Sequence, residues 1–128
     1  MKKLTTWLLQ EIMINNADRY APFLQEYAAG ETIFKTGDPA DYLGVLLTGS
    51  IEIRKYDKLL SIVEPGSIFG EMGLIDGQPR CADAISKSRS RIAMIRDAQF
   101  KSMLSSTPTF AISIMGVLTE RLRNNVET

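Results

Sequence analysis

The chain has 128 residues, with 15 basic and 15 acidic side chains and a formal net charge of zero. This length suits one domain, and a content of 45% apolar and 23% charged residues excludes wholesale disorder. The balanced charge argues against a surface built throughout for nucleic acid. Histidine, the commonest general base and metal ligand, is absent, so the composition predicts neither an enzyme nor a metal site. The single cysteine, Cys81, excludes an internal disulfide and fits a reducing cytoplasm.

Residues 1–19 form a predicted N-terminal helical extension. Leu4, Leu8 and Ile12 recur every four positions, which is the spacing of one face of an amphipathic α-helix. The apolar stretch reaches Gln10 without a small-residue cleavage site. A helix is therefore favoured over a signal peptide.

Residues 29–96 carry the pattern of an antiparallel sandwich or barrel. Short apolar or alternating runs are separated by turn residues about every ten positions. The runs are 33–34, 43–47, 51–53, 59–63, 68–69, 82–85 and 91–95. Gly49 is expected to turn one hairpin with a positive φ, and Tyr56-Asp57-Lys58 the next. Ahead of these strands, a short helix is expected through Phe23-Leu24, because a proline precedes it.

Two closing helices are expected over residues 98–125. The first has an apolar face made of Phe100, Met103 and Leu104. The second is expected to start with Thr107 as N-cap and Pro108 as the first helical residue. The uncharged run 102–119 has the length of a membrane span. Because proline breaks this run and hydroxyl side chains fill it, no membrane interaction is predicted.

The second closing helix has two apolar surfaces. A stripe interpreted as the face buried on the sheet contains Ala111, Ile114, Met115, Leu118 and Leu122. Ile112 and Leu118-Thr119 extend round the helix beyond this stripe. They form a candidate seam for a homodimer through the C-terminal helix.

The segment from Phe69 to Ala82 carries the candidate chemistry. Gly70 and Gly73 allow a ligand to approach the backbone closely, and a helical turn here would leave free amides for an anion. Arg80 has a planar guanidinium that can bind two phosphate oxygens, and Glu71 can accept a hydrogen bond from a sugar hydroxyl. A small nucleotide needs both groups. The alternative is a structural ion pair between Glu71 and Arg80, which contributes only about 0–1 kcal/mol when exposed.

Residues 66–82 resemble the phosphate-binding cassette of the cyclic nucleotide-binding domain family. That family includes bacterial catabolite activator proteins and the regulatory subunits of cyclic AMP-dependent kinase. The resemblance is carried by Gly66-Ser67-Ile68-Phe69-Gly70-Glu71-Met72-Gly73-Leu74 and by Arg80-Cys81-Ala82. Further similarity extends it to roughly residues 20–125, in the segments 29–34, 37–38, 41–42, 49–53, 100–104 and 120–123 and at Pro108. The resemblance implies a mainly β fold, an antiparallel β-jelly roll with N-terminal helices and two C-terminal helices.

The resemblance also implies a binding site. Glu71 would bind the ribose 2′-hydroxyl, and Arg80 would bind the exocyclic phosphate oxygens. Backbone amides near Gly70, Cys81 and Ala82 would complete the phosphate shell. The implied cyclic-nucleotide-binding residues are Phe69, Gly70, Glu71, Met72, Gly73, Arg80, Cys81 and Ala82.

Three further residues are candidate contacts to the base. Ile53 and Leu60 face each other across a predicted hairpin, although core packing is an alternative role for both. Asn125 lies at the end of the last helix, where the family often brings a side chain over the base. Its alternative role is a helix cap.

Cys81 departs from the family pattern, because many bacterial members have Ser or Thr at this position. A thiol is a weak hydrogen-bond donor, so the loss of one bond to phosphate is expected, at about 1.5–3 kcal/mol. In similar domains a hydroxyl here also favours guanine, so its absence favours cyclic AMP over cyclic GMP. With no histidine to activate the thiol, a half-buried packing role is preferred to a redox or nucleophilic one.

The sequence therefore predicts a single-domain cyclic nucleotide sensor, residues 1–128, with no required cofactor and no catalytic turnover. No helix-turn-helix motif follows Arg123, so DNA is not an expected partner and an unidentified effector protein is. The alternative function is a nucleotide-free jelly-roll module that docks a partner protein. An enzyme on a cupin-like barrel would need metal ligands that a histidine-free chain does not readily supply.

Overall fold

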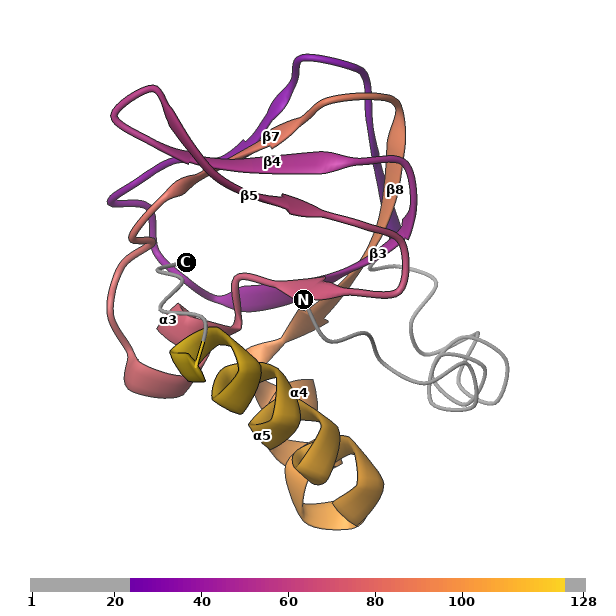
Figure 1. The fold of residues 1–128 in the computed structure, drawn as a ribbon. Coiled ribbons are helices and arrows are strands. Elements are labelled where there is room, and N and C mark those ends of the chain that lie inside the picture. Colours follow the sequence, from indigo (N-terminus) through magenta and orange to yellow (C-terminus); the bar gives the residue numbers. More distant parts are fainter. Residues whose placement is uncertain (1–23, 124–128) are drawn as a thin grey trace.

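The computed structural model describes residues 24–123 (Figure 1). The N-terminal helix expected within residues 1–19 and the base contact expected at Asn125 lie outside the described residues. Within them, the chain forms two four-stranded sheets, a short helix between strands and two closing helices. The mainly β architecture that the sequence predicted is confirmed.

Both sheets are antiparallel. In spatial order, the first contains β1 (Leu24–Tyr27), β8 (Ser90–Arg96), β3 (Tyr42–Thr48) and β6 (Ile68–Phe69). The second contains β2 (Thr32–Phe34), β7 (Asp83–Ser86), β4 (Ile51–Lys55) and β5 (Lys58–Val63). Neighbouring strands in space are often distant in sequence, so the chain crosses repeatedly between the sheets, as a jelly roll requires.

The start of the described chain corrects one expectation. The helix expected through Phe23-Leu24 is wrong, because Leu24 begins strand β1. This strand pairs with β8 in a register that places Leu24 opposite Ala93 and Tyr27 opposite Ser90. Hydrogen bonding to a distant strand has overridden the local proline signal, so the sheet begins before residue 29.

The predicted hairpin turns are confirmed. Gly49, between β3 and β4, has a φ of 103°. Tyr56 and Asp57, between β4 and β5, both have positive φ values, 52° and 63°. A two-residue connection with this backbone twist matches the twist of the strands it joins.

The first sheet is buried on both faces, and this explains the continuous apolar run in β3. Leu43 and Val45 belong to the core cluster beneath this sheet, together with side chains of the closing helices. Tyr42 and Leu46 belong to the cluster between the two sheets. Successive side chains of a strand point to opposite faces, so alternate residues of β3 serve different cores.

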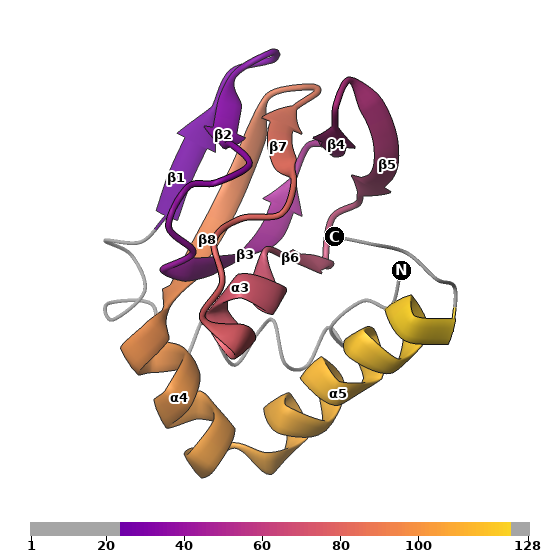
Figure 2. The same ribbon diagram turned by 90° about the vertical axis from the view of Figure 1, so that its left-hand side faces the viewer.

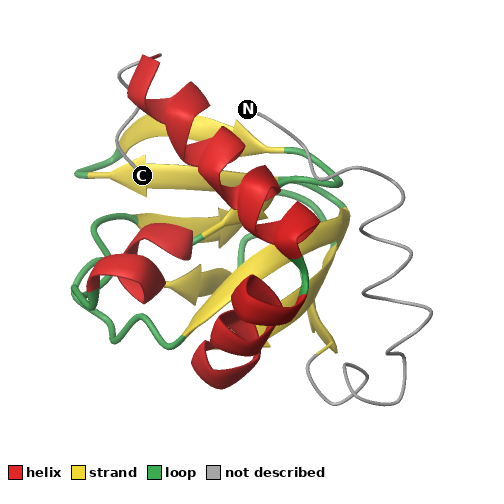
Figure 3. Ribbon diagram, turned by 90° about the horizontal axis from the view of Figure 1, so that it is seen from below, coloured by secondary structure: helices red, strands yellow, loops and turns green. Residues whose placement is uncertain are grey.

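The closing helices α4 (Asp97–Ser106) and α5 (Pro108–Arg123) pack beneath the first sheet. Figure 2 shows them meeting at an angle below the sheets, and Figure 3 shows α5 lying across the sheet with α4 beside it. Pro108 opens the second helix, as predicted. No single helix among residues 24–123 is long and apolar enough to span a membrane, and α4 and α5 reach that length only as a pair bent by 112°.

The buried face of α5 differs from the predicted stripe. Ile114 is buried, as expected, but Met115 and Leu122 are 58% and 83% exposed. The buried residues of the helix are Phe110, Ile114, Val117 and Arg121. A buried arginine thus occupies the position that the apolar pattern assigned to leucine.

Candidate functional site

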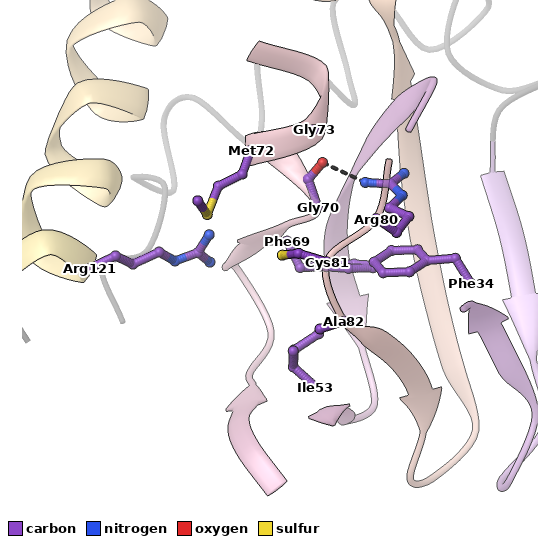
Figure 4. Close-up of a pocket in the computed structure, with 10 residues that line it drawn as sticks. All are labelled: Phe34, Ile53, Phe69, Gly70, Met72, Gly73, Arg80, Cys81, Ala82 and Arg121. Atoms are coloured by element: carbon purple, nitrogen blue, oxygen red, sulfur yellow. Dashed lines mark hydrogen bonds between the residues drawn. The ribbon is translucent and has the colours of Figure 1, made fainter. Parts of the chain in front are cut away.

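A pocket lies between the cassette, the sheets and the end of α5. It opens to solvent, and its empty space, which includes part of that opening, is about 380 Å³. Its lining residues are Phe34, Ile53, Phe69, Gly70, Met72, Gly73, Arg80, Cys81, Ala82 and Arg121 (Figure 4). All but two of these, Phe34 and Arg121, were candidates from the sequence. Leu60 and Glu71 were also candidates, but they are not among the lining residues.

The cassette folds as predicted, with one turn of helix after Gly70. Helix α3 spans Glu71–Asp76, and Gly70 caps its N-terminus in the left-handed region, with a φ of 76°. A side chain at Gly70 would also press against the guanidinium of Arg80. Gly73 lies in α3 against Ala40, where an added Cβ would collide with the Ala40 side chain. Both glycines therefore permit close packing that a larger residue would prevent.

Arg80 is held from several directions. Its backbone pairs with the loop after β2, through the amide of Arg80 to the carbonyl of Asp38 and the amide of Gly37 to the carbonyl of Arg80, both at 2.8 Å. Its guanidinium donates to the carbonyl oxygens of Gly70 and Tyr42, both at 2.6 Å. The residue is only 4% exposed. These contacts fix the side chain at the pocket wall.

The charge of Arg80 has no acidic partner among the described residues. The alternative ion pair with Glu71 is wrong, because the carboxylate of Glu71 pairs with Arg121 instead. Burial lowers the pKa of the Arg80 guanidinium, and the nearby Tyr42, Asp41 and Asp38 oppose this effect. A buried cation without a carboxylate partner is costly unless another group compensates its charge. The lining of the pocket therefore favours an anion.

Glu71 and Arg121 join the cassette to α5. Glu71 is fully buried, and one of its carboxylate oxygens forms an ion pair with Nη1 of Arg121. Nη2 of Arg121 donates to the carbonyl oxygen of Ile68 at 3.0 Å. Burial lowers the pKa of Arg121 to about 10, so the guanidinium is still protonated at neutral pH. The last helix is thus tied by charge to the segment that forms the pocket.

The remaining wall is mainly apolar. Ile53 is buried in the core between the sheets and also lines the pocket, whereas Leu60 is partly buried and packs against that core. Core packing is therefore the observed role of Leu60. Cys81 is exposed at the pocket, so its expected half-buried packing role is wrong. Figure 4 shows Arg121 and Met72 on one side of the pocket and Arg80 with Phe34 on the other.

Two residues of the site, Phe34 and Arg121, were missed as functional candidates. Arg121 lies seven residues after the buried Ile114, so helical spacing alone places it on the buried face. Phe34 ends a predicted strand beside the turn at Gly37, and nothing in the local pattern separates it from ordinary core residues.

The model of the family described as the cyclic nucleotide-binding domain matches residues 24–107. This chain belongs to the cyclic nucleotide-binding domain family. The match covers most of the described residues and includes the whole cassette. The resemblance stated from the sequence is confirmed, together with the β-jelly-roll fold that it implied.

Known relatives agree with this membership. A CRP-like cAMP-activated global transcriptional regulator of Mycobacterium tuberculosis is 31% identical over 104 residues, which are 77% of this chain and 46% of that protein. A cGMP-dependent protein kinase of Plasmodium berghei is 37% identical over 86 residues, 67% of this chain and 10% of the kinase. A solved cyclic nucleotide-binding domain from Methylobacillus flagellatus is 26% identical, with a TM-score of 0.73 over 86% of this chain and 68% of that one. The chain thus spans less than half the length of these two curated relatives.

Proposed function

We propose that this domain is a regulatory sensor that binds a cyclic nucleoside monophosphate, with cyclic AMP preferred to cyclic GMP. The observation that carries the proposal is the buried guanidinium of Arg80. It lines a largely apolar pocket and has no carboxylate partner among residues 24–123. A ligand with one negative charge and an apolar aromatic face complements such a pocket in both charge and polarity.

Two side chains are proposed to bind the polar parts of the ligand. Arg80 donates to the phosphate, because two of its five N–H groups are used by protein carbonyls and three remain. Glu71 accepts a hydrogen bond from the ribose hydroxyl, because its Oε2 atom has no hydrogen-bond partner among the described residues. The amides near Gly70, Cys81 and Ala82 are proposed to complete the phosphate shell. The pocket wall also contains three uncharged residues, Phe69, Met72 and Gly73, which are proposed to contact the ligand without binding its charge.

The preference for cyclic AMP is based on Cys81. A thiol at the pocket supplies no strong hydrogen bond to the amino group of guanine. One relative is named as cAMP-activated and another as cGMP-dependent, so the family includes proteins of both kinds. Among the described residues, Ile53 is the proposed contact with the base, since it lines the pocket; Asn125 stays a candidate from the sequence.

We propose a regulatory rather than catalytic role. Binding at Glu71 changes the surroundings of Arg121, so a ligand that prefers one placement of α5 shifts the population toward it. The output then passes to an effector protein or to a second copy through α5, on which Ile112 is 67% exposed. The cytoplasm is the proposed location, because cyclic nucleotide regulation operates there and the lone Cys81 needs no oxidising compartment.

Titration calorimetry tests this function. The protein is titrated at low salt with cyclic AMP, with cyclic GMP and with linear 5′-AMP as a control for the ring-closed phosphate. Binding of cyclic AMP in preference to both others is expected. Arg80→Gln should weaken binding by at least about 2 kcal/mol, close to thirtyfold, because it removes one partner of a buried charge pair. Absence of binding below millimolar concentration would favour the alternative function, a nucleotide-free docking module.

A further inference from the structure

The guanidinium of Arg80 lies over two aromatic rings. Its central carbon is 4.1 Å from the centroid of the Phe34 ring and 4.8 Å from the centroid of the Tyr42 ring. Both distances fall within the range of cation–π interactions, about 6 Å. Phe34 and Tyr42 are 8% and 9% exposed. Cation–π attraction is stronger where water is excluded, so the burial of both rings strengthens their contacts with Arg80.

The rings and the carbonyl groups hold Arg80 in complementary ways. The carbonyls of Gly70 and Tyr42 accept hydrogen bonds from the two terminal nitrogens. The rings attract the positive charge without accepting either of those bonds. A carboxylate in their place would neutralise the charge and use the remaining N–H groups. Aromatic contacts therefore fix the side chain and leave both its charge and three N–H groups for a ligand.

The two rings are themselves braced by their neighbours. Phe34 ends β2 and Tyr42 begins β3, so each ring comes from a different sheet. Phe34 stacks on Phe69, with centroids 6.1 Å apart, and meets Tyr42 edge to face at 6.4 Å. Gly70 leaves the adjoining space open, because a Cβ there would lie 2.5 Å from Nη1 of Arg80 and 3.4 Å from the Phe34 ring.

We propose that Phe34 and Tyr42 are positioning residues of the phosphate site. Through cation–π contacts, their rings keep the guanidinium of Arg80 in the orientation that binds the ligand. This inference rests on the function proposed above and deepens it. Preorganisation of this kind raises affinity because the side chain does not have to be ordered when the ligand arrives. Ligand affinity should then depend on the aromatic character of positions 34 and 42, beyond their contribution to core packing.

Binding measurements with matched variants test the proposal. Cyclic AMP is titrated calorimetrically into the wild type, Phe34→Leu, Phe34→Tyr and Phe100→Leu. Phe34→Leu should weaken binding roughly three- to thirtyfold, the range of a desolvated cation–π contact. Phe34→Tyr keeps an aromatic ring at this position and should retain most of the wild-type affinity. Phe100→Leu makes the same change in a residue that is 3% exposed in the other core cluster, so it reports general destabilisation alone.

A double-mutant cycle separates positioning from packing. In an Arg80→Gln background, Phe34→Leu should cause no further loss of affinity, because no cation remains to be held. Tyr42→Phe and Tyr42→Leu form a second conservative pair, in which only the leucine variant should bind more weakly. Equal losses in Phe34→Leu and Phe100→Leu, or an equal loss with and without Arg80, would overturn the proposal.

A measurement without ligand distinguishes this proposal from the proposed function. In an NMR spectrum, the Nε–Hε signal of Arg80 should be shifted upfield by the ring currents, and Phe34→Leu should reduce that shift. If the wild type binds neither cyclic nucleotide, the proposed function fails, and this spectrum still decides whether the rings hold Arg80. An Arg80 signal that Phe34→Leu leaves unchanged would refute the positioning role.

Discussion

Replacing Arg121 with methionine is expected to destabilise the folded domain by about 3–5 kcal/mol. The side chains of Arg121 and Glu71 are 7% and 0% exposed, so water does not compensate the carboxylate once its partner is removed. The variant also loses the hydrogen bond to the carbonyl of Ile68. Methionine keeps much of the apolar volume, which limits the contribution of a cavity to the measured loss.

This loss is large for a domain of 128 residues. Total stabilities of such domains are about 5–15 kcal/mol, so the variant loses roughly a fifth of the total or more. At roughly 3–5 °C per kcal/mol for this size, the Tm should fall by about 9–25 °C. Adding Glu71→Leu to Arg121→Met removes the unpaired carboxylate, and the double variant should recover part of the stability.

Urea unfolding followed by circular dichroism measures these changes. Arg123→Met is the matched control, because Arg123 is exposed on the same turn of α5 and should change stability by less than about 0.5 kcal/mol. A loss below about 1 kcal/mol for Arg121→Met, or an equal loss in the control, would show that the ion pair behaves as a solvated surface pair. A double variant less stable than Arg121→Met alone would contradict the assignment of the cost to the orphaned carboxylate.

Three other changes have definite expected outcomes. Burial raises the pKa of Tyr42 from 10.0 to about 12. The unfolded chain therefore loses the phenol proton at a lower pH than the folded domain does, so the protonated phenol favours folding below pH 10 and this contribution is lost as the pH rises. The free energy of unfolding of the wild type, relative to Tyr42→Phe, should fall by about 1 kcal/mol between about pH 9 and 11. Gly70→Ala should cost about 1–2 kcal/mol of stability because its φ is 76°, and should weaken cyclic AMP binding because the new methyl group displaces Arg80. Cys81→Ser should tighten cyclic AMP binding roughly tenfold or more, since a hydroxyl can donate to the phosphate.

Each of these has its own check. Unfolding curves that keep the same difference between wild type and Tyr42→Phe at both pH values would show that the phenol titrates normally in the folded state. Gly77→Ala is the control for Gly70, because its φ is 73° with no atom within 4 Å of an added Cβ. If both alanine variants bind nucleotide equally, the contact with Arg80 does not matter for binding. Calorimetry on Cys81→Ser that gives an unchanged Kd would place the thiol away from the phosphate.

Local patterns predicted those parts of the fold that depend on neighbouring residues. The turns at Gly49 and Tyr56, the helical turn after Gly70 and the helix start at Pro108 follow from backbone preferences, and all are observed. The strand that begins at Leu24 was missed, because its hydrogen-bond partners lie in β8, far along the chain. A strand of four residues is too short for its own hydrophobic pattern to indicate pairing with β8.

The site shows the same division between local and distant information. The spacing of Gly70, Glu71 and Arg80 identified the cassette, but most partners of the two charged residues come from other parts of the chain. Glu71 meets Arg121 of the last helix. Arg80 meets the ring of Phe34 in β2 and both the ring and the carbonyl of Tyr42 in β3, as well as the carbonyl of Gly70. Sequence spacing shows which groups are available, whereas tertiary packing decides which of them meet.

Three consecutive residues each contact a different side chain that lines the pocket. The carbonyl of Ile68 accepts a hydrogen bond from Arg121 of α5, the ring of Phe69 stacks on Phe34, and the carbonyl of Gly70 accepts a hydrogen bond from Arg80. Two of the three contacts are made by backbone carbonyls, so they do not depend on the side chains at positions 68 and 70. The route from the last helix to the guanidinium on the opposite wall is thus only three residues long, and substitutions within it should weaken any coupling between those two ends while leaving both in place.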